Sequence, residues 1–85
     1  MSGKTAKLAF AGGTLYAAVG SSDGMCIWKY SNGAWSKPSE KLTGKETVAY
    51  DLQAYGSTVF LAAADQSIDK TFVWYEDSDG TFVRN

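Results

Sequence analysis

Short apolar runs alternate along the chain with small groups of glycine, asparagine, aspartate and serine. Aromatic and β-branched side chains are frequent within the runs, and no run keeps the period of an amphipathic helix. Runs of this length and composition, bounded by turn residues, predict β-strands. The expected strands are residues 6–11, 14–20, 25–30, 34–37, 47–55, 58–64, 71–76 and 81–84. The pattern therefore predicts an all-β fold.

Glycine-containing pairs of residues separate most of these expected strands. The signals in the first half are Gly12-Gly13, Asp23-Gly24 and Asn32-Gly33. Those in the second half are Gly56-Ser57, the polar residues 65–70 and Asp79-Gly80. Such pairs favour tight hairpins, because glycine, asparagine and aspartate tolerate the positive φ angles of two-residue turns. The polar segment from Pro38 to Lys45 is then the connection between two four-stranded halves.

The two halves of the chain repeat one pattern of turns and strands. The segments that align are residues 8–18 with 52–62, 26–28 with 72–74, and 32–35 with 79–82. The period of roughly 44 to 47 residues is typical of four-stranded propeller blades. We therefore expect one domain, residues 1–85, made of two blade repeats at about 5–38 and 46–85.

Several of the expected strands are apolar on both faces of their sheet. Successive side chains of a strand point to opposite faces, yet Val59 and Leu61 on one face and Phe60 and Ala62 on the other are all apolar. A strand of this kind belongs to a sheet that is covered on both sides. Two stacked sheets cover only two of their four faces, so we expect copies of the chain to associate.

Association of copies would complete a closed β-propeller, which uses about four to eight blades. Two, three or four copies meet that requirement, and we favour six blades from three chains. The fold class expected is therefore all-β, with two antiparallel blades in each chain and a homo-oligomeric ring. The alternative is a single small sandwich or barrel in which the two repeats face one another.

Three segments of the chain resemble a known class of repeats. Residues 51–62 and 70–75 resemble blades of bacterial cell-surface propeller repeats, in which a Gly-Thr turn precedes a Tyr-Val-Ala-type strand. Residues 28–35 follow the second half of those repeats, where a strand leads through Asn-Gly to a tryptophan. The architecture is also similar to that of small two-blade lectins, which form six-bladed rings from three chains and bind sugars between blades. The resemblance implies a carbohydrate ligand and an extracellular location.

Composition narrows the classes of partner. The 85 residues carry a formal net charge of −1, and Arg84 is the only arginine, so the arginine-rich pockets of fucose-binding lectins have no counterpart here. Nucleic-acid binders present a basic face, so we expect no nucleic-acid partner. The chain shows no signal-peptide h-region and no membrane-length apolar stretch, which predicts a soluble protein without membrane insertion. The lone Cys26, in an apolar run, predicts a small core residue.

Candidate catalytic chemistry is scarce in this sequence. The chain contains no histidine, which excludes histidine-based triads and removes the commonest general base. The run Asp77-Ser78-Asp79-Gly80 begins like a calcium loop, but no acidic residue follows at the required distance. It predicts a hairpin turn instead. We therefore expect no enzyme, no catalytic residue, no metal and no cofactor.

The aromatic residues are the best candidates for ligand contacts. Trp28 and Trp74 occupy equivalent blade positions, so core packing explains both, whereas Trp35 lies beside a turn on a short outer strand. The copies differ where a pocket between blades would form, because Tyr30 aligns with Glu76 and Lys29 with Tyr75. The expected sugar-binding residues are Trp35 and Tyr75, which would stack, and Glu76, Asp77, Asp51 and Arg84, which would hydrogen-bond hydroxyls.

The hypothesis from sequence is thus a non-catalytic, lectin-like propeller module with shallow repeated sites. A second hypothesis is a structural or protein-interaction piece, either a propeller fragment or an engineered self-assembling unit, with no small-molecule ligand. Its partner would be other copies of the chain. Binding to sugars distinguishes the two hypotheses, since both require the same assembly.

Overall fold

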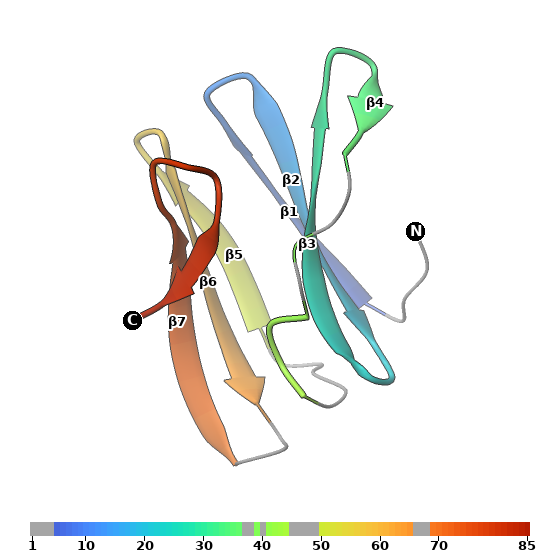
Figure 1. The fold of residues 1–85 in the computed structure, drawn as a ribbon, viewed down its shortest axis with the longest axis vertical. Coiled ribbons are helices and arrows are strands. Elements are labelled where there is room, and N and C mark those ends of the chain that lie inside the picture. The colour runs from blue at the N-terminus through green and yellow to red at the C-terminus, as the bar shows by residue number, and fades with distance from the viewer. Residues whose placement is uncertain (1–4, 37–38, 40, 45–49, 66–68) are drawn as a thin grey trace.

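Two antiparallel β-sheets make up the described part of the protein, which is residues 5–36, 39, 41–44, 50–65 and 69–85 of a computed structural model. The first sheet consists of β1 (Thr5–Ala11), β2 (Thr14–Ser21), β3 (Gly24–Ser31) and β4 (Ala34–Trp35). The second consists of β5 (Tyr50–Tyr55), β6 (Thr58–Asp65), β7 (Lys70–Glu76) and β8 (Phe82–Arg84). Neighbouring strands follow chain order in both sheets (Figure 1). The prediction of an all-β chain with two four-stranded antiparallel sheets is confirmed.

Most strand boundaries lie within one residue of those predicted. The strand expected at 34–37 is shorter, since Ser36 already lies outside β4, and residues 47–49 of the fifth expected strand are outside the described residues. The Asp23-Gly24 turn is displaced by one position, because Gly24 pairs with Ser21 and leaves Ser22 and Asp23 as the loop. The turns at Gly12-Gly13, Asn32-Gly33 and Gly56-Ser57 fall where the sequence placed them. The turn expected at Asp79-Gly80 has Ser78 and Asp79 at its centre, because the Gly80 N–H donates to the Asp77 carbonyl.

Cross-strand register is the same in the two sheets at aligned positions. Ala17 pairs with Trp28 in the first sheet, and the residues aligned with them, Leu61 and Trp74, pair in the second. The outermost pairs agree in the same way: Tyr30 with Trp35, and Glu76 with Phe82. Residues that align in the sequence therefore occupy equivalent places in the two sheets.

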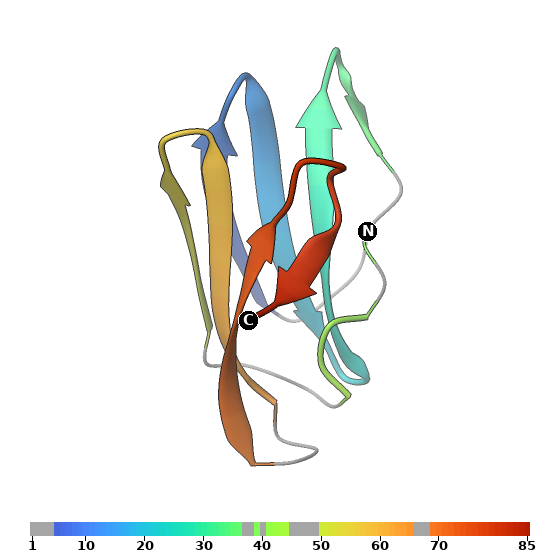
Figure 2. The same ribbon diagram turned by 60° about the vertical axis from the view of Figure 1, so that its left-hand side comes forward.

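The sheets pack face to face, and the core lies between them (Figures 1 and 2). We call the two surfaces that meet the inner faces. The first sheet supplies mainly Tyr16, Ala18, Met25 and Ile27. The second supplies Leu52, Val59, Leu61, Ala63, Trp74 and Phe82. All of these side chains are buried, because each is covered by the opposite sheet.

The distance between the sheets is not uniform. Their backbones approach each other most closely where β1 lies beside β5 (Figure 1). The small side chains of Ala9 and Ala11 pack against the core at that edge. Farther from it, the larger rings of Trp74 and Phe82 fill the interior. The two sheets therefore diverge away from the β1–β5 edge, and together they have a wedge shape.

Each sheet also has an outer face, and both outer faces are largely apolar. The outer face of the first sheet has no charged strand residue. Its side chains are Ala6, Leu8, Phe10, Leu15, Ala17, Val19, Cys26, Trp28, Tyr30 and Trp35. The outer face of the second carries Phe60, Ala62, Val73, Tyr75 and Val83, with Asp51, Gln53 and Tyr55 on β5. Leu8 and Phe10 are each 62 % exposed, and Phe60 and Val73 are 37 % and 41 % exposed. Both outer faces thus present apolar side chains to solvent.

The segment after β4 continues along the edge of β3. The Ser36 N–H donates to the Lys29 carbonyl and the Leu42 N–H to the Met25 carbonyl, each at 2.8 Å. Between them, Ser39 is joined to Ile27 by two hydrogen bonds: its N–H donates to the Ile27 carbonyl, and its Oγ accepts from the Ile27 N–H. These bonds satisfy backbone groups that an edge strand would otherwise expose.

Candidate functional site

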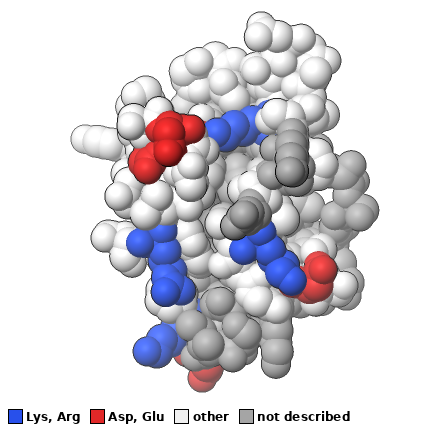
Figure 3. All heavy atoms as spheres, viewed as in Figure 1, with Lys and Arg blue, Asp and Glu red and all other residues white. Residues whose placement is uncertain are grey.

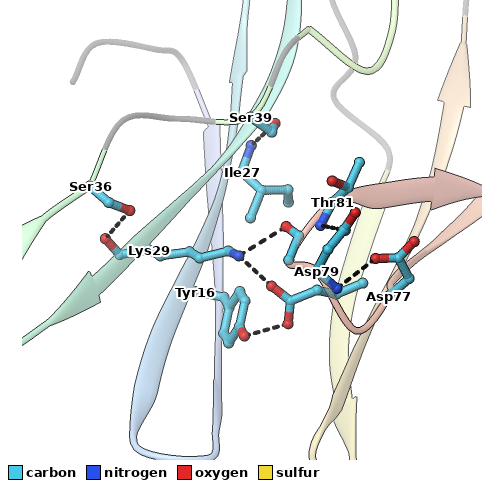
Figure 4. A network of polar contacts seen from close by, with 10 residues as sticks. Tyr16, Ile27, Lys29, Ser36, Ser39, Asp77, Asp79 and Thr81 are labelled. Carbon is cyan, nitrogen blue, oxygen red and sulfur yellow. Dashed lines mark hydrogen bonds and ion pairs between the residues drawn. The ribbon is translucent and has the colours of Figure 1, made fainter.

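A polar network joins the two sheets inside an otherwise apolar interface (Figure 4). The Tyr16 hydroxyl on β2 donates to Oε1 of Glu76, at the end of β7, over 2.5 Å. Lys29 on β3 forms an ion pair with Oε2 of the same carboxylate. The Lys29 ammonium also donates to the Gly80 carbonyl at 3.0 Å. We call Tyr16, Lys29, Glu76 and the Gly80 carbonyl the inter-sheet lock.

Strand register places the members of the lock. Tyr16 and Lys29 are directly opposite on β2 and β3 and share the inner face of the first sheet. Glu76 is opposite Phe82, on the inner face of the second. The Tyr16 and Phe82 rings meet edge to face at 6.3 Å, and the Lys29 ammonium lies 5.7 Å from the centroid of the Tyr16 ring, within cation–π range.

Burial fixes the protonation of the tyrosine in this lock. Tyr16 is 6 % exposed, and burial, with the hydrogen bond to Glu76 and its negative charge, raises the pKa of Tyr16 to about 12. The phenol is therefore a neutral donor at physiological pH. The side chains of Lys29 and Glu76 are 30 % and 12 % exposed, and their charges compensate each other. This arrangement ties the sheets together and presents no activated nucleophile.

The hairpin between β7 and β8 delivers the carbonyl that Lys29 contacts. The Asp77 N–H donates to the Thr81 carbonyl at 2.9 Å, and the Gly80 N–H donates to the Asp77 carbonyl at 3.0 Å. Oδ1 of Asp77 accepts from the Asp79 N–H, and Oδ1 of Asp79 accepts from the Thr81 N–H, both at 3.0 Å. Both carboxylates are thus used within the hairpin turn that the sequence predicted here.

Three of the six expected sugar-binding residues lie on the outer faces. Trp35 is 39 % exposed on the outer face of the first sheet, where its ring packs against Tyr30 at 5.1 Å. Tyr75 is half-buried on the outer face of the second sheet, in register with Phe60. Asp51 is exposed on the same face, with β6 between it and Tyr75.

The other three lie at or near the inner side of the second sheet. Glu76 belongs to the inter-sheet lock and Asp77 to the hairpin turn. Arg84 places its guanidinium 4.1 Å from the centroid of the Phe72 ring. A single chain therefore distributes the six expected residues over different surfaces and does not gather them into one pocket.

Two packing predictions have different outcomes for equivalent residues. Trp74 is 3 % exposed in the core, as predicted. Trp28 and Cys26 are only half-buried and lie on the outer face, so the prediction of core positions for them is wrong within one chain. The reason is that β3 is apolar on both sides, which leaves the choice of inner face open. Burial, aided by the charge of Asp23, raises the pKa of the Cys26 thiol.

Tyr16 and the Gly80 carbonyl are members of the lock that sequence reasoning did not single out. The sequence did contain a signal for the Lys29–Glu76 contact of the lock, because the two repeats differ at the aligned pairs Lys29/Tyr75 and Tyr30/Glu76. At each aligned pair one repeat has a charge and the other an aromatic residue, with Lys29 in the first repeat and Glu76 in the second, and these opposite charges suggest a contact between the repeats. Tyr16 had no comparable signal, since it aligns with another aromatic residue, Phe60.

Surface charge, clusters of possible metal ligands and membrane-spanning segments are further features that could indicate a function. On the face shown in Figure 3, charged side chains of both signs form small separate groups, and most of the face is uncharged. Among the described residues, no three Cys, Asp or Glu side chains are grouped to hold a metal ion. No helix in the described ranges is long and apolar enough to cross a membrane.

Comparison with protein-family models, with curated proteins and with solved structures finds no significant match to this chain. The two uncovered apolar faces and the network that joins the sheets are the features of the molecule that bear on its function. The first feature concerns what the protein binds. The second concerns how one pair of sheets is held in place.

Proposed function

We propose that the protein is a non-catalytic binding module whose working unit is a closed propeller, with six blades from three copies of the chain. The observation that carries this proposal is the exposed apolar character of both outer faces. Each face has three long strands about 4.8 Å apart and roughly 23 Å long, which amounts to an area on the order of 300 Å². Each face is about as large as the largest apolar patch of a typical soluble monomer, and this chain has two of them on opposite sides.

Burial of these faces supplies the driving force for association. Leu8 and Phe10 on the first sheet and Phe60 and Val73 on the second would leave water together. Apolar burial stabilises by roughly 25 cal/mol per Å², although association costs part of that gain. The wedge shape of the sheet pair favours a ring over a flat stack, because each added pair turns the direction of the next.

The non-catalytic part of the proposal is supported by the polar groups that the structure describes. The charges of Lys29 and Glu76 compensate each other, and the raised pKa of Tyr16 keeps its phenol protonated. The carboxylates of Asp77 and Asp79 accept hydrogen bonds within their own turn. None of these groups is placed as a general base beside an activated nucleophile.

Carbohydrate is the ligand class that we propose for the assembled module. Exposed aromatic rings such as Trp35 and Tyr30 offer apolar faces on which sugar rings stack. Asp51 and Tyr75, on β5 and β7 of the second outer face, add acceptors and a donor for hydroxyl groups. Repetition of such shallow sites around a ring would strengthen weak binding through avidity.

Titration with a panel of simple sugars and glycans tests this ligand class. Calorimetric heat and a change in tryptophan fluorescence are expected for at least one sugar, and Trp35→Ala should abolish both. Tyr55→Ala is the matched control, since Tyr55 is 83 % exposed at the end of β5, away from Trp35 on the other sheet. Absence of heat and of any fluorescence change with every sugar would contradict carbohydrate binding.

A self-assembling structural unit without a small ligand is the second candidate. It is favoured by the packing of Trp35 against Tyr30 at 5.1 Å, because rings that already contact each other can serve as an interface surface. Assembly with no response to any glycan would support this candidate. Assembly with specific heats of sugar binding would support the lectin-like module.

A further inference from the structure

The interface inside one chain joins two faces that are not equivalent. Ile27 on the inner face of the first sheet is 1 % exposed, whereas the aligned Val73 is on the outer face of the second and is 41 % exposed. Leu52 on the inner face of the second sheet is 3 % exposed, whereas the aligned Leu8 is on the outer face of the first and is 62 % exposed. Each outer face is thus the repeat counterpart of an inner face on the other sheet.

We propose that the outer face of the second sheet of one copy docks on the outer face of the first sheet of the next copy. This mode rests on the proposed function, in which copies of the chain associate. It repeats between chains the packing that the structure shows within one chain. Because the two surfaces differ, the contact is head-to-tail, and such contacts form closed rings when the rotation per copy divides a full turn.

Aligned positions name the residues that would meet at this junction. Tyr16 and Lys29 of the inter-sheet lock correspond to Phe60 and Tyr75, and their partners Glu76 and Phe82 correspond to Tyr30 and Trp35. The junction between copies therefore places Phe60 and Tyr75 of one copy against Tyr30 and Trp35 of the next. An aromatic cluster replaces the charged lock, so two kinds of junction alternate around the ring.

Charge and exposure fit this pairing. The outer face of the first sheet has no charged strand residue, and the facing surface of the second has Asp51 only, on β5. Tyr30, Trp35 and Phe60 are each between 37 % and 39 % exposed in one chain, and the neighbouring copy would cover part of each ring. The junction also brings Trp35 beside Tyr75, two residues that sequence analysis assigned to one binding site.

Mixing two face-blocked variants tests the head-to-tail mode. Leu8→Glu blocks the outer face of the first sheet, and Val73→Glu blocks that of the second. Both side chains are exposed in one chain, and the aligned residues Leu52 and Ile27 are nearly fully buried in the interface between the sheets. Each variant alone should remain a 9.1 kDa monomer. Their mixture should form a 1:1 complex of twice that mass, because one free face of each kind remains.

The alternative is face-to-itself pairing, in which like faces meet. Each blocked variant would then dimerise alone through its free face, and the mixture would form no additional species. That result overturns the head-to-tail mode and the closed three-chain ring, while leaving association of the outer faces intact. A wild-type chain that stays monomeric would instead overturn the proposed function along with it. Complex formation in the mixture also shows that both variants are folded.

A charge graft tests the register within the head-to-tail mode. Tyr30→Glu and Tyr75→Lys transfer the Glu76–Lys29 pair to the junction between copies, while the two residues of one chain lie on opposite outer sides. Each single variant should associate roughly tenfold more weakly than wild type, or weaker still, since an unpaired charge is buried. The variant with both substitutions should recover most of that loss. Tyr30→Glu with Tyr75→Glu is the matched control and should not recover.

Recovery when Tyr30→Glu is combined with Tyr75→Lys, without recovery in the control, is the result that the proposed register requires. Equal association of both double variants would show that the two positions do not meet, and would overturn the register. Circular dichroism of the dissociated variants checks that they are folded. If a charged single variant is unfolded, the neutral variants Tyr30→Gln and Tyr75→Gln take its place, and their association is compared with that of the wild type. Each of these two single glutamine variants should associate more weakly than the wild type, and unchanged association would contradict the proposed contact.

Discussion

At the scale of single residues, the inter-sheet lock holds a charge pair inside an apolar interface. The Glu76 side chain is 12 % exposed and has both carboxylate oxygens engaged, one by Tyr16 and one by Lys29. A buried carboxylate without a partner is costly. The contribution of Glu76 to stability therefore depends on its contacts with both Tyr16 and Lys29, and not on the ion pair alone.

Removal of the lysine should destabilise the fold. Lys29→Met leaves the Glu76 carboxylate without a cation and removes the bond to the Gly80 carbonyl, and we expect a loss of roughly 1–3 kcal/mol. Adding Glu76→Gln should recover part of this loss, because the neutral amide oxygen still accepts from Tyr16. Urea unfolding measures both changes. Lys70→Met, at an exposed position of β7, is the control, and a loss equal to that of Lys29→Met would contradict the role of the lock.

Tyr16 should make stability fall in strongly alkaline solution. Its pKa rises from 10.0 in the unfolded chain to about 12 in the folded protein. Between these values the folded state retains a proton that the unfolded state has released, so the free energy of unfolding decreases as pH rises. This contribution is fully present below pH 10. Denaturant midpoints should decrease less steeply from pH 10 to 12 in Tyr16→Phe than in wild type; parallel profiles would contradict the assignment.

At the scale of elements, the hairpins and the edge of β3 show what the sequence could predict. Two-residue turns are local, so pairs such as Asn32-Gly33, with φ angles of 53° and 82°, identify themselves. The contact of Gly24 with the segment after β4 is not local. A Cβ atom on Gly24 would lie 2.2 Å from the Thr43 carbonyl oxygen. No periodicity or turn rule could predict that contact, because the segment from Pro38 to Lys45 has no repeating pattern in the sequence.

Glycine-to-alanine substitutions should separate the cost of a positive φ angle from the cost of a steric clash with the segment after β4. Gly24→Ala places a methyl group against the Thr43 carbonyl at a φ of 138°, and we expect a loss of roughly 2–4 kcal/mol. Gly33→Ala is the matched control, since its φ of 82° is also positive but no atom lies within 4 Å of the added Cβ. It should cost only about 1 kcal/mol. Thermal melts compare the two, and equal losses would contradict the packing of this segment on β3.

At the scale of the whole molecule, strands were easier to predict than faces. Alternation and turns placed the strands, and the repeat aligned them, because both signals are contained in short windows of sequence. Short windows of sequence did not show which face of each sheet packs against the other sheet. Trp28 and Trp74 are equivalent in the repeat, yet one is half-buried outside and the other is in the core. A strand that is apolar on both sides carries no local mark of the side that meets its partner sheet.

The candidate site was predictable only in part for the same reason. Trp35 and Tyr75 lie on outer faces at opposite sides of one chain, and Glu76 is committed to a contact with Tyr16 that spans 60 positions of sequence. Long-range contacts of this kind depend on how the sheets stack. If the outer faces pair as proposed, the expected aromatic site forms only between chains, so the sequence of one chain names its residues without showing their proximity.

The mass of the folded protein in solution tests the central claim most directly. Size-exclusion chromatography with multi-angle light scattering, over a wide dilution series, should give one species at two, three or four times 9.1 kDa, and at three times that value for the six-bladed ring. The same sample should show the far-ultraviolet circular dichroism of a β-protein. A folded species that stays at 9.1 kDa at every concentration, with its apolar outer faces exposed, would contradict the account.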